Sequence, residues 1–366
     1  MTSRLALTCA AFALLAGACG PGAAAPSPTP GATATVRIVT PEPTPTPSPT
    51  PTPTVYWPLT GVVAEDAARV HRRPLNVRLP NDRAARPHVG LATADIVFEM
   101  IVEGGITRFA AIFHASDAVE VGPVRSYRFS DLHITQMLRG ALVASGATVE
   151  ERDAVTTSIS AGNLISVDAQ RDGRAYYRVP GRPGPNDLFA NLDRAREAVN
   201  DAGGGGPVDV PPLTFLPPGD HDELAGGFET SVPATTVTIP FRGDPASFVW
   251  EPAVGGYRRM QGGLQTVDPD GNVPILARNV VVIWTDIWET TVVQDIFGSL
   301  GLDYRMTGGG RAAIFRDGRR VDGTWRRDSP LDMFTFHDSA GEEIALAPGQ
   351  SWIHFVYQDW VVTHSP

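Results

Sequence analysis

The 366-residue sequence contains no lysine and only two cysteines, and both cysteines lie within the first 19 residues. If Cys19 starts the mature chain as an acylated residue, the folded part has no free thiol. This excludes disulfides, thiolate metal sites and cysteine nucleophiles. The 30 basic residues are all arginines, against 40 acidic residues and a net charge of −10. That balance argues against nucleic-acid binding, and an anionic ligand would need a local cluster of arginines.

Motifs of several common enzyme classes are also missing from the sequence. It contains no P-loop, no HExxH zinc motif, no GxSxG nucleophile elbow and no Cys-His pair. The histidines are scattered without the spacing of metal ligands, among them His114, His133, His337 and His354. The sequence therefore identifies no cofactor and leaves open whether the protein is an enzyme.

The first 19 residues have the pattern of an export signal. Arg4 precedes an apolar stretch over 5–18, which ends in small residues directly before Cys19. This stretch is shorter than the ~20 apolar residues that span a bilayer. Its ending resembles the lipobox of bacterial lipoproteins, in which the cysteine is acylated; an ordinary secretion signal is the alternative. We expect Cys19 to be lipidated and to anchor the chain at the outer face of the cytoplasmic membrane.

Residues 20–54 predict an extended linker. Ten prolines alternate with serine and threonine between 26 and 54. Repeated X-Pro disfavours helix and removes backbone donors, so this segment should adopt a polyproline conformation. At ~3.1 Å per residue it would reach on the order of 100 Å, which holds a folded body well away from lipid headgroups.

Residues 95–114 predict a β-hairpin. Two strand-like segments, 95–103 and 106–114, flank the pair Gly104-Gly105. A two-residue turn would place Glu103 opposite Ile106 and would fix which side chains share a face. One face would then be apolar, and the other would carry Asp95, Glu99, Glu103, Arg108 and His114. This charged face is either a solvated surface with cross-strand ion pairs or the floor of a cleft.

Two arginines precede a predicted helix in the segment that follows. Arg125 and Arg128 come just before Ser130, a good N-cap, and the helix should end at Gly140. Guanidinium groups beside free backbone N–H groups can form an anion site, to which Arg108 and Ser126 would also contribute. In the alternative, the arginines pair internally with Asp95, Glu99 or Asp131.

The remaining pattern predicts two domains after the linker. Residues 55–205 alternate strand and helix signals, with a helix capped by Asn186, and favour an α/β domain with a mixed sheet and flanking helices. A Gly-rich and Pro-rich boundary begins near Gly203. Residues 206–366 then favour a β-rich antiparallel domain. Its tryptophans either line a sugar-binding groove or pack in the core, as is more common; they are Trp250, Trp284, Trp288, Trp325, Trp352 and Trp360.

Several motifs resemble the YerB-like bacterial lipoproteins, whose body is a domain of unknown function, DUF3048, with a separate C-terminal partner domain. The motifs are Pro58-Leu59-Thr60-Gly61, Glu103-Gly104-Gly105-Ile106-Thr107-Arg108, Val121-Gly122-Pro123-Val124-Arg125-Ser126 and Asn186-Asp187-Leu188. The resemblance covers residues 57–366 and implies an envelope lipoprotein in two parts, without an established activity. Pro185 stands where the family has a histidine before Asn186.

Two functions follow from these observations. The first is an envelope binding or regulatory module that recognises an anionic glycopolymer or a partner protein through its arginines. The second rests on a looser similarity to LytR-CpsA-Psr phosphotransferases, which act on polyprenyl-pyrophosphate-linked wall polymers. In that case the arginines would bind pyrophosphate, and a divalent metal would be held by acidic residues from the set Asp95, Glu99, Glu103 and Asp131.

Overall fold

The computed structural model describes residues 54–366 except 117, 218 and 220–221. The predicted signal peptide, Cys19 and nearly all of the predicted linker therefore lie outside the described residues. The described residues form one compact unit.

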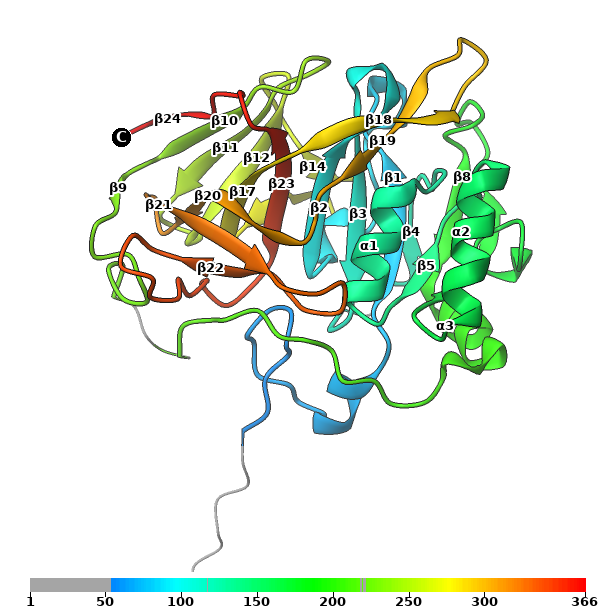
Figure 1. Cartoon of the computed structure of the whole chain (residues 1–366), viewed down its shortest axis with the longest axis horizontal. Helices are drawn as coiled ribbons and strands as arrows, with labels where there is room; N and C mark the ends of the chain where they lie inside the picture. Colours follow the sequence, from blue (N-terminus) through cyan, green and yellow to red (C-terminus); the bar gives the residue numbers. More distant parts are fainter. Residues whose placement is uncertain (1–53, 117, 218, 220–221) are drawn as a thin grey trace, which may run out of the picture. The chain divides into compact units, whose positions relative to one another are not determined.

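Eleven strands form one mixed sheet that runs through this unit (Figure 1). In spatial order they are β22 (Thr335–His337), β21 (Arg319–Arg327), β20 (Gly308–Arg316), β17 (Asn279–Thr285), β23 (Ser351–Tyr357), β2 (Ile96–Ile101), β3 (Thr107–Phe113), β1 (Leu75–Pro80), β5 (Ala141–Val143) and β6 (Ile165–Ser166), with β9 (Val232–Pro233) paired to β21. The strands β17, β23 and β2 are parallel neighbours. Their side chains are almost all buried, as expected of central strands that are covered on both faces.

A second, antiparallel sheet packs on one face of the first. Its strands are β13 (Leu264–Gln265), β12 (Gly256–Gln261), β11 (Ala246–Glu251), β10 (Thr236–Ile239) and β24 (Thr363–Ser365), with β16 (Leu276–Ala277) paired to β12. Aromatic rings join the two layers: the ring centroids of Phe248 and Trp352 lie 5.8 Å apart. The β-rich segment thus buries its apolar face against the central sheet.

Three smaller sheets complete the β structure. They are β14 (Val267–Asp268) with β15 (Val273–Pro274), β18 (Ile287–Val293) with β19 (Leu300–Tyr304), and β4 (Glu120–Val121), β8 (Leu188–Asn191) and β7 (Tyr176–Arg178). The β18–β19 pair covers the other face of the central sheet, where the rings of Tyr304 and Phe355 are 5.9 Å apart. It extends from the body as an arm that exposes Ile296 and Phe297 at its end (Figure 1).

The helices lie beside the end of the central sheet that contains β1, β5 and β6 (Figure 1). They are α1 (Phe129–Met137), α2 (Val149–Ser160) and α3 (Leu192–Val199), with short 3₁₀ turns η1 (Ala67–His71), η2 (Arg83–Ala85), η3 (Leu91–Thr93), η4 (Glu103–Gly105) and η5 (Gly173–Ala175), and a π turn, η6 (Asn200–Gly204). Gln136 of α1 donates a 2.7 Å hydrogen bond to Ser158 of α2. The predicted fold class, an α/β first part and a β-rich antiparallel second part, is confirmed.

Strands from both halves of the chain meet inside the central sheet. β2 and β23 pair in parallel from Ile96 with Ser351 to Glu99 with His354. The predicted boundary at Gly203 therefore lies in a connection between two parts of one sheet. This pairing brings the hairpin into contact with residues more than 250 positions later.

The hairpin has a different register from the predicted one. Ile101 pairs with Thr107, and the connection includes the 3₁₀ turn η4 (Glu103–Gly105). The predicted two-residue turn is therefore wrong, and the register differs by one residue. Because side chains alternate between the two faces, this shift by one residue distributes the predicted charged residues over both faces of the hairpin. Arg108 pairs with Met100, whereas Glu99 pairs with Phe109 and lies on the opposite face. Both faces are buried, so neither is a solvated surface.

Two predicted helix starts also differ. Arg128, not Ser130, is the N-cap of α1, and its backbone N–H donates to the Asp131 carboxylate at 2.7 Å. Asn191, not Asn186, caps α3 by accepting from the backbone N–H of Arg194 at 3.0 Å. The segment after Asn186 instead forms strand β8, since its apolar residues pair with β4 and β7.

Candidate functional site at the tip of the central hairpin

Glu103, Arg108 and Arg128 meet below the hairpin tip and are named here the Glu103 cluster. Arg108 Nη2 donates to Glu103 Oε1 at 2.8 Å, and Arg128 Nε donates to Glu103 Oε2 at 2.9 Å. All three side chains are buried. Burial alone would raise the pKa of Glu103, but the hydrogen bond from Arg128 and the charge of Arg108 outweigh it and lower the pKa to about 2. The carboxylate is therefore ionised at neutral pH.

The other residues of the predicted anion site lie next to this cluster. Ser126 accepts through its carbonyl oxygen from Arg108 Nη1 at 2.9 Å. Arg125 is half-buried, and its Nε has no hydrogen-bond partner among the described residues. The Asp131 carboxylate lies 3.1 Å from Arg78 Nη1, with both side chains fully buried. The structure thus brings the arginines together, but Arg108 and Arg128 are bound to Glu103 rather than presented at the surface.

Asp95 and Asn186, two further residues of the predicted site, lie apart from the Glu103 cluster. Asp95 accepts hydrogen bonds from the backbone N–H groups of His114 and Ala115, the latter at 2.8 Å, and so fixes the end of the hairpin. Burial raises its pKa to about 6 against these hydrogen bonds. Asn186 is also buried, and its side-chain oxygen has no partner in the described part of the chain.

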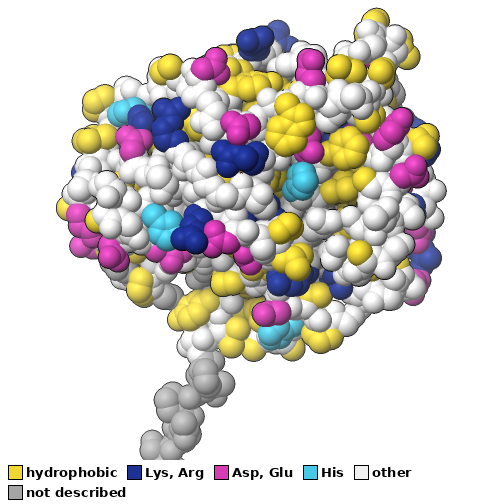
Figure 2. All heavy atoms as spheres, in the orientation of Figure 1, with side chains coloured by type: hydrophobic (Ala, Val, Ile, Leu, Met, Phe, Trp, Pro, Cys, Tyr) yellow, Lys and Arg dark blue, Asp and Glu magenta, His cyan; other side chains and the backbone are white. Residues whose placement is uncertain are grey.

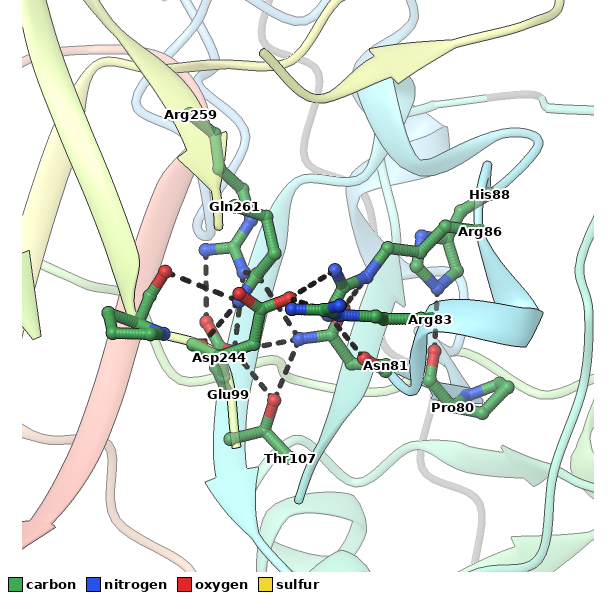
Figure 3. Close-up of polar contacts among 11 residues, drawn as sticks. Pro80, Asn81, Arg83, Arg86, His88, Glu99, Thr107, Asp244, Arg259 and Gln261 are labelled. Atoms are coloured by element: carbon green, nitrogen blue, oxygen red, sulfur yellow. Dashed lines mark hydrogen bonds and ion pairs between the residues drawn. The ribbon is translucent and has the colours of Figure 1, made fainter. Parts of the chain in front are cut away.

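Glu99 is the centre of a separate polar group, named here the Glu99 cluster (Figure 3). Arg259 binds both carboxylate oxygens at 3.0 and 3.2 Å, and Thr107 and Asn81 donate to it at 2.8 and 3.1 Å. The Arg259 guanidinium also stacks 4.3 Å from the ring centroid of Trp352. Burial would raise the pKa of Glu99, but Arg259 and the other partners lower it to about 2. This cluster joins the two halves of the chain within the core.

These contacts bear on the predicted metal site. Asp95 is bound to backbone amides, Glu99 to Arg259, Glu103 to Arg108 and Arg128, and Asp131 to Arg78. Residues 54–366, as far as they are described, contain no group of three side chains of the kind that hold a metal ion. The four carboxylates therefore do not form the shared ligand set that a divalent cation needs.

A cleft of about 340 Å³ opens at the hairpin tip, and we call it the tip cleft. One side is the turn formed by Glu103, Gly104 and Gly105, and another is strand β19. Tyr357 at the end of β23 and Trp360 beyond it supply aromatic surface, and their ring centroids lie 5.4 Å apart. Gly104 and Gly105 both have a positive φ, which a side chain would strain.

Arg242 and Glu289 are the exposed charged residues of the tip cleft. Neither makes a hydrogen bond or ion pair through its side chain with the residues that the structure describes. Both act on Tyr357: its pKa is raised by burial, while Arg242 lowers it and Glu289 raises it. The cleft therefore combines two aromatic rings with an unpaired guanidinium and an unpaired carboxylate.

Sequence reasoning singled out Trp360 and the hairpin turn but missed Arg242 and Glu289. Both come from segments far from the hairpin, and no local motif marks them. Of the two roles considered for the tryptophans, core packing holds for Trp325 and Trp352, which are buried, whereas Trp360 lies at a cleft.

The face of the described residues that Figure 2 draws shows no concentrated positive patch. In Figure 2, the basic side chains lie beside acidic ones rather than in one continuous patch. Among the described residues, no helix has the length and apolarity that are needed to cross a membrane.

The mixed central sheet, the apposed antiparallel sheet and the tip cleft define a two-part α/β protein. Two family models match the chain: the DUF3048 N-terminal domain over residues 59–204 and the DUF3048 C-terminal domain over residues 237–353, both described as protein of unknown function. The chain belongs to the DUF3048 family, as its motifs predicted.

A sequence match and a structure match, both to YerB of Bacillus subtilis, accompany this assignment. A protein of strain 168 with the name "Putative lipoprotein YerB" is 25% identical over 299 residues, which cover 82% of this chain and 85% of the relative. The crystal structure of the YerB protein superposes with a TM-score of 0.70 at 22% identity, covering 85% of this chain and all of that one. The second match shows a shared fold.

Proposed function

We propose that this protein is a binding module of the cell envelope that recognises an anionic glycopolymer in the tip cleft. The observation that carries the proposal is the pairing of aromatic rings, Tyr357 and Trp360, with the unpaired guanidinium of Arg242. Aromatic rings stack on the apolar faces of sugars, and guanidinium groups bind carboxylates and phosphates. A lipid on Cys19 and a long linker would hold this cleft outside the cytoplasmic membrane.

The Glu103 cluster has an indirect role in this proposal. Arg108 and Arg128 are buried and both bind the single carboxylate of Glu103, so they hold the turn at Gly104 and Gly105 rather than contact a ligand. A buried, hydrogen-bonded charge pair gives a stiff support for the cleft wall. The contact that the sequence placed at Arg125 and Arg128 is therefore assigned to Arg242, which lines the tip cleft as neither of the two does.

Phosphotransfer with a divalent metal, the alternative function, lacks support in the geometry. It requires several carboxylates around one ion, and the four acidic candidates each have a different partner. None of the four lies in the tip cleft except Glu103, which is engaged by two arginines.

Binding to wall polymer tests the proposal. The probe is the anionic polysaccharide that mild acid releases from the cell walls of the organism that makes this chain, titrated by calorimetry into the purified protein. Arg242→Ala should weaken binding about tenfold or more, since a hydrogen bond to a charged group contributes ~1.5–3 kcal/mol. Arg194→Ala removes another exposed arginine, on α3, and should leave binding unchanged. No binding by the unaltered protein would refute the proposal.

A further inference from the structure

We infer that the ligand site continues past Trp360 into a second cleft, so that the ligand is a linear anionic polymer bound along several repeat units rather than at one sugar. The inference rests on the proposed function and specifies its ligand. A second cleft, of about 410 Å³, is lined by Trp284, Arg311, Arg320, Asp322 and Trp360. We call it the Arg311 cleft.

Trp360 is the residue that the two clefts share. Its backbone is fixed by hydrogen bonds: Trp284 Nε1 donates to its carbonyl at 2.8 Å, and its own N–H donates to the Tyr357 carbonyl at 3.1 Å. Its ring contacts Tyr357 and Phe241 at centroid distances of 5.4 and 6.0 Å. A half-buried ring held in this way is a wall common to both clefts, and a chain lying across it would contact both.

Arg311 is positioned in advance for an anion in the second cleft. Its guanidinium stacks 4.4 Å from the ring centroid of Trp284, and Nη2 donates to the Gln358 carbonyl at 2.9 Å. Arg311 has no carboxylate partner among the described residues, so it keeps its charge and its other N–H donors for a ligand. The nearby Arg320 is paired with Asp322 and is less available.

A third cleft continues the series on the other side of the hairpin turn. It has a volume of about 160 Å³ and shares Gly105 with the tip cleft. Arg83 lies there with 83% of its side chain exposed and 3.9 Å from Asp244, a carboxylate that Arg86 already binds. Each of three adjoining clefts therefore holds an arginine that can bind an anionic group. This grouping occurs in a protein whose net charge is −10.

This arrangement fits a ligand with repeated anionic groups. A monosaccharide or a single terminal phosphate would fill one cleft and leave the other arginines unused. A linear polymer would place successive charges at Arg83, Arg242 and Arg311 and would stack a sugar on Trp360. Contacts made along one chain add without a new loss of translational freedom, so affinity should rise with chain length.

The experiment separates this inference from the proposed function. Wall polymer, released as above, is fractionated by size into short and long chains, and each fraction is titrated into the full-length protein and its variants. The unaltered protein should bind long chains about tenfold more tightly than short ones. Arg311→Ala should lose this gain and retain affinity for short chains, whereas Arg242→Ala should weaken both. Arg194→Ala should behave like the unaltered protein.

Each result has a distinct meaning. If short and long chains bind equally well and Arg311→Ala has no effect, the continuous groove is wrong and the proposed function stands. If no fraction binds, both are wrong. Because the Arg311 side chain is exposed on β20, its variant should fold, and an unchanged far-ultraviolet circular dichroism spectrum checks this.

Discussion

Glu99 and Glu103 lie four residues apart on one hairpin, and both hold buried arginines. In the Glu99 cluster the side chains of Glu99 and Arg259 are fully buried, with Arg259 stacked on Trp352 and the carboxylate bound from both halves of the chain, while Asn81 and Thr107 line the third cleft. The Glu103 cluster lies under a turn, and beyond that turn is the tip cleft. The comparison shows that buried glutamate–arginine contacts join the two sheets at Glu99 and support the wall of the tip cleft at Glu103.

The largest effect on stability should follow from breaking the Glu99 cluster. Arg259→Met leaves the buried carboxyl of Glu99 without its main partner, so the free energy of unfolding should fall by about 3–5 kcal/mol. Guanidinium denaturation of the variant measures this. The double variant Glu99→Gln with Arg259→Met should recover part of the loss, since the unpaired charge is removed. A loss under about 1 kcal/mol would show that the Glu99 cluster is not a structural link.

The second effect should come from the cluster under the turn. The pKa of Glu103 is about 2 in the folded state, below its ordinary 4.5. Its stabilisation is therefore fully present above pH 4.5 and is lost as the pH falls towards 2. Glu103→Gln should lower the free energy of unfolding by about 3 kcal/mol at pH 7, and the gap should narrow on acidification. Denaturation of both proteins between pH 2 and 7 measures the gap, and a gap independent of pH would contradict the ion-pair account.

A smaller effect should arise from the turn itself. Gly104 has φ 72°, and a Cβ added there meets no atom within 4 Å, so Gly104→Ala tests backbone conformation alone. The left-handed conformation costs a residue with a side chain roughly 1–2 kcal/mol. Gly206→Ala is the matched control, since Gly206 has no positive φ and also has open space. Equal thermal midpoints for both variants would remove the argument for a glycine at the turn.

The smallest effect on stability should come from the cleft rim. Arg242→Ala and Glu289→Ala remove side chains without partners in the described structure, so the free energy of unfolding should change by less than about 0.5 kcal/mol. Their binding to wall polymer should nevertheless differ from that of the unaltered protein. Thermal denaturation provides the check, and a loss above 1 kcal/mol would place these residues in the structural framework instead.

The sequence predicted the elements better than their placement. The β-rich second part was predicted from its short apolar segments, and the structure confirms it in strands such as β17 and β23. The register of 95–114 was wrong because the Gly-Gly pair indicates a turn but not its length. Asn186 was predicted as the helix cap because apolar residues with helical spacing follow it, but the first of these residues lie in strand β8.

The candidate site was harder to predict because its parts are far apart in the sequence. Glu103, Arg108 and Arg128 were identified within one local segment, and the structure brings them together. Arg259 and Arg242 could not be associated with the hairpin, since nothing in the local pattern reveals that β2 pairs with β23 or that the second sheet packs on the first. Long-range pairing, rather than propensity, decides which arginines are buried and which face a cleft.

Hydrogen exchange in the presence of wall polymer tests the central claim most directly. Binding in the tip cleft should slow amide exchange in two segments, 101–105 and 357–360, while the amides around Glu99 remain protected with or without polymer. Protection confined to the end of the β18–β19 arm near Phe297, or slowed exchange at neither segment in a protein that binds the polymer, would contradict the assignment of the site.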